Sequence, residues 1–168
     1  IKGVTVGDVV KNKRSEFTRL YGYGSQPTCG GAALGGSSME FQWSVQTKMT
    51  ESSAWISLSA EEVRKLQSSK NPLNMVVPPY GLKAGLWYRF TVTGSMLSTP
   101  SVFNVAHADF EVLQSDLKSV ILDGNREVGN SADTLLLDGS QSSDPDDSVV
   151  AMSYAWSCVV AGTATGCV

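Results

Sequence analysis

The pattern aromatic–x–Trp–Ser–apolar at residues 41–46 (FQWSVQ) returns at residues 154–159 (YAWSCV), 113 positions later. In both stretches every second residue is aromatic or apolar, as on a β-strand that buries one face. A Gly-Ser-Gln triplet precedes each stretch, at 24–26 and at 139–141. Two landmarks in the same order and at nearly the same offset predict an internal duplication.

Strand signals dominate the rest of the chain, which is rich in β-branched and aromatic runs separated by Gly, Pro, Asn and Ser. Only residues 59–67 have a helical pattern, with Ser59 as the expected cap and Val63 and Leu66 on one face. We expect seven strands in the first part of the chain, near 3–10, 15–23, 40–48, 54–58, 73–77, 86–96 and 101–113. We expect three more near 118–122, 133–138 and 151–160.

These patterns predict an all-β protein made of tandem immunoglobulin-like or fibronectin III-like β-sandwiches. Residues 1–114 have the length of one sandwich, whereas residues 115–168 supply only the first strands of a second, incomplete one. A Trp at the centre of an inner strand is typical of such sandwiches. Trp43 and Trp156 are therefore expected in the two cores. We also expect the chain to be a piece of a much larger protein.

The stretch GLKAGLWYRFTV at residues 81–92 places Tyr88 just after a turn with Leu82 and Gly85. This arrangement resembles the tyrosine corner of fibronectin type III domains, in which the hydroxyl bonds to upstream backbone. Tyr88 is accordingly predicted to lie in the core, with its hydroxyl bonded to backbone near Leu82. The alternative is an ordinary half-buried strand tyrosine.

The stretch LLLDGSQSSDPDDSVVAMSYAWSC at residues 135–158 resembles the PKD and REJ (receptor for egg jelly) modules of polycystin-1-like ectodomains. Those modules carry Leu-Asp-Gly-Ser, Asp-Pro-Asp, an aromatic residue, and Trp-x-Cys followed by a second Cys. The matching residues are Leu137, Asp138, Gly139, Ser140, Ser143, Asp144, Pro145, Asp146, Tyr154, Trp156, Cys158 and Cys167. A plain PKD module would continue with Trp-Asp-Phe-Gly-Asp, so the Trp-Ser-Cys of this chain favours the REJ version.

The resemblance implies a disulfide bond between Cys158 and Cys167, which lie nine residues apart across a Gly-containing stretch. Such a bond indicates an oxidising compartment. REJ units of this kind can carry a Cys near the tyrosine-corner strand, where this chain has Tyr88 and Arg89. Cys29 lacks that partner, and is either free and buried or paired outside this chain.

The acidic loop around Asp138, Asp144 and Asp146 is the one candidate cation site, because alternating carboxylates can bind Ca²⁺. The alternative is that Asp144 forms an Asx-turn which orders the loop. The chain has a single His and no Cys-x-x-Cys or Gly-x-Ser-x-Gly motif, so neither a zinc site nor an enzyme is predicted. A net charge of −3 argues against nucleic acid as a partner. The basic residues at 11–14 are expected to form a solvated turn.

The resemblance thus implies a non-enzymatic extracellular segment that spaces and presents binding surfaces on a polycystin-1-like protein. It would lie on the outer side of the plasma, ciliary or flagellar membrane, anchored only by other parts of the parent. Expected partners are neighbouring domains of the same chain, a polycystin-2-type channel or other surface glycoproteins. The alternative is a carbohydrate-binding accessory module of a secreted enzyme or surface glycoprotein, for which Tyr21 and Tyr23 are the candidate exposed aromatics.

Overall fold

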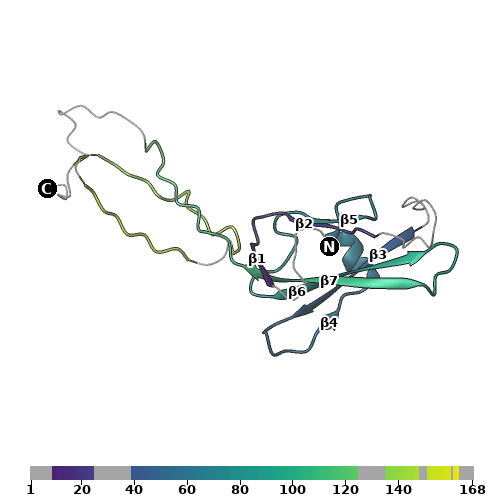
Figure 1. Cartoon of the computed structure of the whole chain (residues 1–168). Helices are drawn as coiled ribbons and strands as arrows, with labels where there is room; N and C mark the ends of the chain where they lie inside the picture. Colours follow the sequence, from purple (N-terminus) through teal and green to yellow (C-terminus); the bar gives the residue numbers. More distant parts are fainter. Residues whose placement is uncertain (1–8, 25–38, 125–134, 148–150, 160, 163–168) are drawn as a thin grey trace. The chain divides into compact units, whose positions relative to one another are not determined.

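The computed structural model describes residues 9–24, 39–124, 135–147, 151–159 and 161–162. The chain divides into two compact units, Ile1–Ser115 and Asp116–Val168, which are described separately here. Figure 1 shows the elements, all of which lie in the first unit. In chain order they are β1 (Val9–Lys13), β2 (Thr18–Tyr21), β3 (Met39–Lys48), β4 (Ile56–Ser57), α1 (Ala60–Leu66), β5 (Asn74–Val77), β6 (Trp87–Met96) and β7 (Phe103–Leu113).

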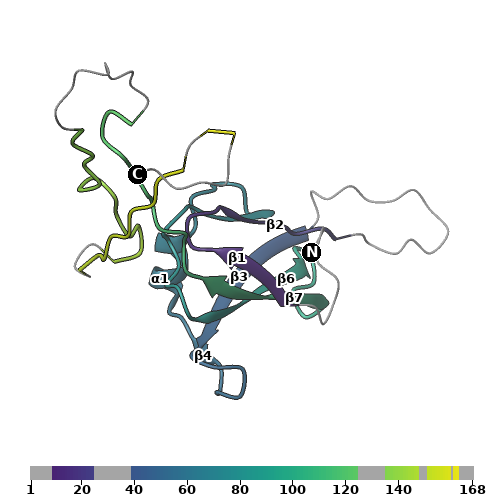
Figure 2. The ribbon, with the colours of Figure 1, turned by 90° about the vertical axis from the view of Figure 1, so that its left-hand side faces the viewer.

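The strands form a five-stranded sheet in the order β1-β7-β6-β3-β4 and a two-stranded sheet of β2 and β5. β1 runs parallel to β7, whereas the other pairs are antiparallel. The β2–β5 pair covers one face of the larger sheet (Figure 2). The first unit is therefore an all-β structure with two layers.

The core lies between the two sheets. Along β6 the side chains alternate between buried and half-buried, so Tyr88, Phe90 and Val92 point inward. Phe90 is fully buried and meets Phe110 of β7 edge to face, with ring centroids 5.6 Å apart. The remaining buried apolar side chains are Leu20, Trp43, Val45, Val63, Met75, Val77, Leu82, Ala108 and Val112.

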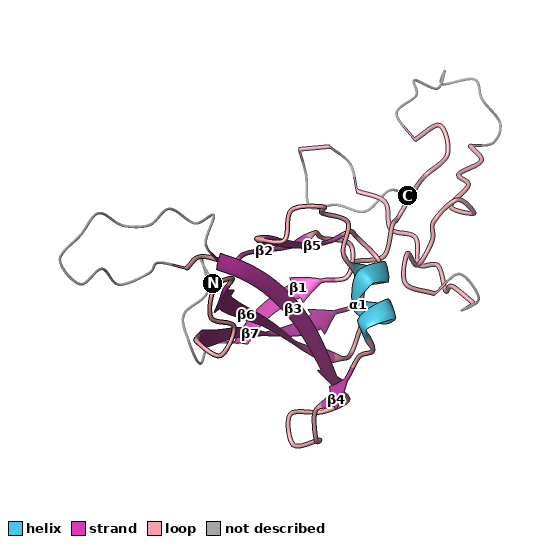
Figure 3. Ribbon diagram, turned by 90° about the vertical axis from the view of Figure 1, so that its right-hand side faces the viewer, coloured by secondary structure: helices cyan, strands magenta, loops and turns pink. Residues whose placement is uncertain are grey.

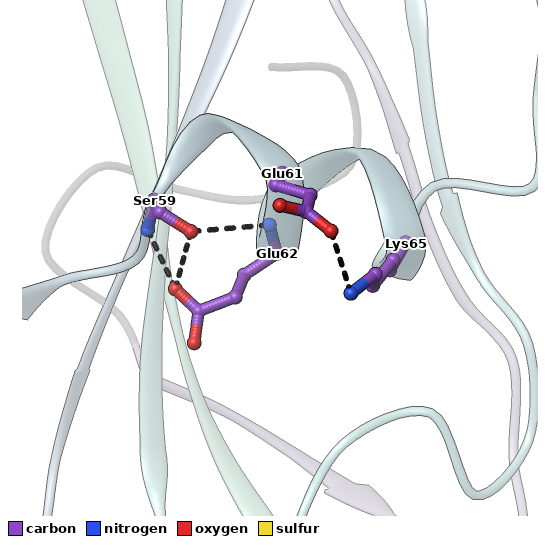
Figure 4. Close-up of polar contacts among 4 residues, drawn as sticks. All are labelled: Ser59, Glu61, Glu62 and Lys65. Atoms are coloured by element: carbon purple, nitrogen blue, oxygen red, sulfur yellow. Dashed lines mark hydrogen bonds and ion pairs between the residues drawn. The ribbon is translucent and has the colours of Figure 1, made fainter.

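The helix α1 begins where the sequence predicts. The Ser59 hydroxyl accepts a hydrogen bond from the backbone N–H of Glu62, and the Ser59 backbone N–H donates to the Glu62 carboxylate (Figure 4). This capping box satisfies N–H groups that have no partner within the helix. Both hydrogen bonds with Ser59 lower the pKa of Glu62, and the bond with the Ser59 side chain contributes more than the bond with its backbone. Val63 is buried against the core and Leu66 packs beside it, so the predicted helix and its apolar face are confirmed.

Six of the predicted strands lie close to β2–β7. Of the first predicted strand, near 3–10, residues 3–8 lie outside the described residues. The described strand β1 runs over Val9–Lys13 and so includes residues that were expected to form a solvated turn. Lys11 pairs with Glu111 on β7 at 3.2 Å, and the Asn12 amide donates to the Thr18 hydroxyl. These contacts hold a polar stretch in the sheet because β1 is an edge strand with one face toward solvent.

The second unit differs from the prediction of three strands. Its described residues form isolated bridges, among them Lys118 with Ser143 and Leu122 with Asp138, and no strand. None of the buried apolar side chains of the described residues comes from this unit. Strands are marginal without an apolar face packed on another layer, and among these residues no such layer forms. The expected second sandwich is therefore not seen in the described part of the chain.

Candidate interaction surfaces

The turn before β6 is built around Tyr88. This side chain is 5% exposed, and its hydroxyl oxygen accepts a hydrogen bond from the backbone N–H of Lys83 at 3.1 Å. The turn needs the left-handed conformation at Gly85, where φ is 75°. The Leu82 carbonyl accepts a bond from Nε of Arg14, which follows β1. The tyrosine thus fixes the entry to β6 with a bond to backbone one residue after Leu82.

The two tryptophans of the repeated pattern lie in different environments. Trp43 on β3 is 8% exposed, and its Nε1 donates to the Pro72 carbonyl at 2.9 Å. Trp156, expected in a second core, is 52% exposed. It lies in a segment without strand structure, so no facing sheet covers its ring. The predicted burial of Trp156 is wrong for this unit.

The REJ-like motif residues of the second unit nevertheless come together. A side chain at Gly139 would approach the Trp156 ring to 3.2 Å and the Tyr154 ring to 3.3 Å. The glycine of the Leu-Asp-Gly-Ser segment is therefore in close contact with both aromatic residues of the later segment. This contact gives a physical reason for glycine at that position.

The acidic loop orders itself with its own carboxylates. Asp138 accepts from the Ser140 N–H and Asp144 accepts from the Asp146 N–H, each at 2.8 Å. These are Asx-turns. Hydrogen bonds from Ser140 lower the pKa of Asp138, and the bond from the Ser140 backbone contributes more than the bond from its side chain. In the described part of the chain no group of three or more His, Cys, Asp or Glu residues is placed to hold a metal ion. The calcium site stays a prediction from sequence.

The cysteines lie largely outside the described residues. Cys158 is disulfide-bonded. Cys29 and Cys167 are not described, so the pairing of Cys158 with Cys167 stays a prediction.

The outer face of the five-stranded sheet carries a cation–aromatic cluster, which consists of Lys48, Trp55, Trp87, Arg89 and Asp109. Nζ of Lys48 lies 4.6 Å from the Trp55 ring centre and 4.9 Å from that of Trp87. It also donates to the Glu51 carbonyl at 2.6 Å, which explains how a lysine can be only 9% exposed. The Arg89 guanidinium lies 4.5 Å from the Trp55 ring.

Asp109 completes this cluster through a two-bond ion pair. Both of its oxygens accept from the Arg89 guanidinium, at 2.7 Å each. The hydrogen bond from Arg89 is the main cause that lowers the pKa of Asp109, and the charges of Arg89, His107 and Lys48 add to it. The same bond raises the pKa of Arg89. Through Trp55, the loop after β3 thus contacts Arg89 on β6, which in turn pairs with Asp109 on β7.

A groove is lined by residues of β3, of α1 and of the segment that follows α1. Figure 3 shows the helix α1 beside the strand β3. Its volume is about 390 Å³, within the range of ligand-binding pockets. The lining residues are Phe41, Gln42, Trp43, Ala60, Val63, Arg64, Gln67, Ser69, Lys70 and Pro72. Two cations and no carboxylate line this groove.

Sequence reasoning missed both the cluster and the groove. The alternation of β6 does place Trp87 and Arg89 on the face opposite Tyr88, which was a usable signal. The contribution of Trp55 comes from a loop, however, and no periodicity predicts where a loop side chain lies. His107, the single histidine, is exposed on β7.

No helix among the described residues is long and apolar enough to cross a membrane. No curated protein and no solved structure matches this chain. The family model of the REJ domain matches residues 37–165, which is more than half of the chain and includes residues of both units. This match agrees with the Leu-Asp-Gly-Ser and Trp-x-Cys segments. The chain belongs to the REJ domain family.

Proposed function

We propose that this chain is a non-enzymatic extracellular segment of a polycystin-1-like surface protein, and that it spaces and presents binding surfaces. The observation that carries the proposal is the REJ match over residues 37–165. The disulfide-bonded Cys158 supports it, because such bonds persist in oxidising compartments such as the cell exterior.

We infer that residues 1–114 are a fibronectin III-like sandwich. Support comes from the two-layer arrangement of the strands and from Tyr88, whose hydroxyl bonds to backbone five residues upstream. Residues 115–168 are then the first part of a PKD/REJ-type module. Its exposed apolar side chains, Leu136 and Trp156 among them, are surfaces for packing against neighbouring modules.

The partners that fit this role are neighbouring domains of the same parent, a polycystin-2-type channel or other surface glycoproteins. The location is the outer side of the plasma, ciliary or flagellar membrane. The compact, two-layer first unit supports a spacing role, because folded modules transmit position better than flexible linkers do.

A replacement experiment tests this function. In the parent protein, residues 9–113 are exchanged for an unrelated β-sandwich of similar length, and a second version deletes them. We expect the replacement to reach the surface but to retain the polycystin-2-type channel less well, since spacing is kept while the specific surface is lost. Unchanged retention in both versions would contradict the proposal, and loss of an enzymatic activity would replace it with another.

The carbohydrate-binding alternative has one observation in its favour. Tyr21 on β2 and Tyr23 just after it are both exposed. A glycan-binding face needs several such rings in a row, and the rings of Trp55 and Trp87 are already in contact with cations. Absence of glycan binding by the unaltered chain would remove this alternative, whereas binding that is lost in a variant lacking both tyrosines would support it.

A further inference from the structure

Among the described residues, one edge of β3 has no partner strand over most of its length. On one side β3 pairs with β6 from Met39 to Lys48. On the other side β4 pairs only with Gln46 and Thr47, at the end of the strand. Among the described residues, the stretch 39–44 therefore has no strand on its second side.

The direction of the backbone groups along this edge follows from one hydrogen bond. The Leu58 N–H donates to the Val45 carbonyl, so the backbone of Val45 points away from β6. Backbone groups of alternate residues in an antiparallel strand point to the same side. The N–H and C=O groups of Phe41 and Trp43 therefore point to the open edge. No partner for them occurs among the described residues.

The helix α1 forms the far wall of the space beside this edge. Ala60, Val63, Arg64 and Gln67 line the groove, at the spacing of one helix face. An unpaired strand edge with a helix running beside it is the arrangement into which an extended peptide can add as a further strand.

The charges of the groove indicate what kind of peptide fits. Arg64 and Lys70 line it, and neither forms an ion pair with a described residue. The acidic residues of α1 are engaged elsewhere, because Glu61 pairs with Lys65 at 2.8 Å and Glu62 caps the helix (Figure 4). The groove is thus a cationic site with an apolar floor.

We propose that this groove binds an extended acidic segment of a partner protein, which pairs as a strand with β3 at Phe41 and Trp43. The inference rests on the proposed function in one respect, that the chain presents binding surfaces. Side chains of alternate residues in the bound segment face the groove, where apolar ones contact its floor and acidic ones reach Arg64 and Lys70.

The first test uses a fluorescently labelled peptide of about six residues, Val-Thr-Glu-Thr-Val-Thr, whose alternate residues present both Val and Glu to one face. Binding to the whole chain is measured by fluorescence polarisation. We expect saturable binding that weakens roughly two- to fivefold in Arg64→Ala, the loss typical of one exposed charge pair. The neighbouring variant Lys65→Ala removes the same charge from the other face of α1 and should bind as the unaltered chain does. Equal loss in both variants, or no binding at millimolar peptide, would overturn the proposal.

Two further measurements separate strand pairing from simple charge attraction. Two versions of the peptide are N-methylated, one at its odd and one at its even positions, and both keep their charges. Only one of them loses the N–H donors that face β3, and that version should lose binding. In hydrogen exchange, the amides of Phe41 and Trp43 should exchange fast in the free chain and slowly with peptide, whereas those of Gln42 and Ser44 stay protected throughout. Protection of Phe41 and Trp43 without peptide, or unaltered binding of both N-methylated versions, would contradict strand addition. Failure here leaves the family role intact, since the replacement experiment tests that separately.

Discussion

Tyr88 joins a buried ring to a single hydrogen bond with backbone. The Tyr88→Phe variant keeps the ring but leaves the part-buried Lys83 N–H without its acceptor. We expect the free energy of unfolding of the first unit to fall by about 1 kcal/mol, as for a typical lost hydrogen bond. Chemical denaturation measures this, with Tyr23→Phe as the control because Tyr23 is 80% exposed. An equal effect of the two variants would mean that the bond contributes nothing.

Asp109 makes the stability of the first unit depend on pH. Its folded-state pKa is lowered, mainly by the hydrogen bond from Arg89. The stabilisation from this pair is therefore complete above the ordinary carboxyl pKa of about 4, and it is lost as the pH falls through the lowered value. Asp109→Asn should reduce stability at neutral pH and flatten the fall in stability toward acid.

A double-mutant cycle checks that this slope belongs to the ion pair. In an Arg89→Ala background, Asp109→Asn should have a much smaller effect on the slope. Persistence of the full slope in Asp109→Asn would assign the acid sensitivity to other groups.

Of this site, the sequence showed only that Arg89 shares a face with Trp87. The contact of Lys48 with Trp55 depends on the course of the loop between β3 and β4, which the periodicity of the sequence does not predict.

At the scale of elements, the alternation of apolar residues and the helix-capping residues were sufficient to predict where the strands and the helix of the first unit lie. β6 and β7 each carry a buried face with period two, and a strand of that length has few other ways to bury it. β1 extends into polar residues because its partner β7 supplies both the ladder and Glu111. In the second unit, by contrast, the predicted strands are not seen among the described residues. Its Leu135, Leu136 and Leu137 are exposed, and the described residues of this unit form no strand, so an apolar run alone does not produce one.

Ser59 is expected to be the residue on which α1 depends most. A helix of seven residues is too short to be stable alone, so loss of its capping box should matter. Ser59→Ala should lower the free energy of unfolding by about 1 kcal/mol, measured by denaturation with Ser101→Ala as an exposed control. A change within experimental error of the control would show that core packing at Val63 suffices without the cap.

At the scale of the whole molecule, the buried core that the structure describes belongs to one unit. Of the described residues, the thirteen buried apolar ones all lie within Ile1–Ser115. A chain of residues 1–115 should therefore unfold cooperatively at nearly the same denaturant concentration as the full chain. A chain of residues 116–168 should show no cooperative transition, because it has too little core. Chemical denaturation of the two fragments and of the full chain decides this, and a sharp transition in the shorter fragment would mean that it builds a core of its own.

We expect this folded segment to lie outside the cell, and lysine labelling on living cells tests this location directly. Cells that express the parent protein are treated with a membrane-impermeant amine reagent, before or after permeabilisation, and labelled lysines are identified by mass spectrometry. Lys70 and Lys83 are exposed, whereas Lys48 is 9% exposed and packed between two tryptophan rings. If the segment is extracellular, Lys70 and Lys83 should be labelled equally in intact and permeabilised cells, and Lys48 should stay unlabelled in both. Labelling of Lys70 and Lys83 only after permeabilisation would contradict it.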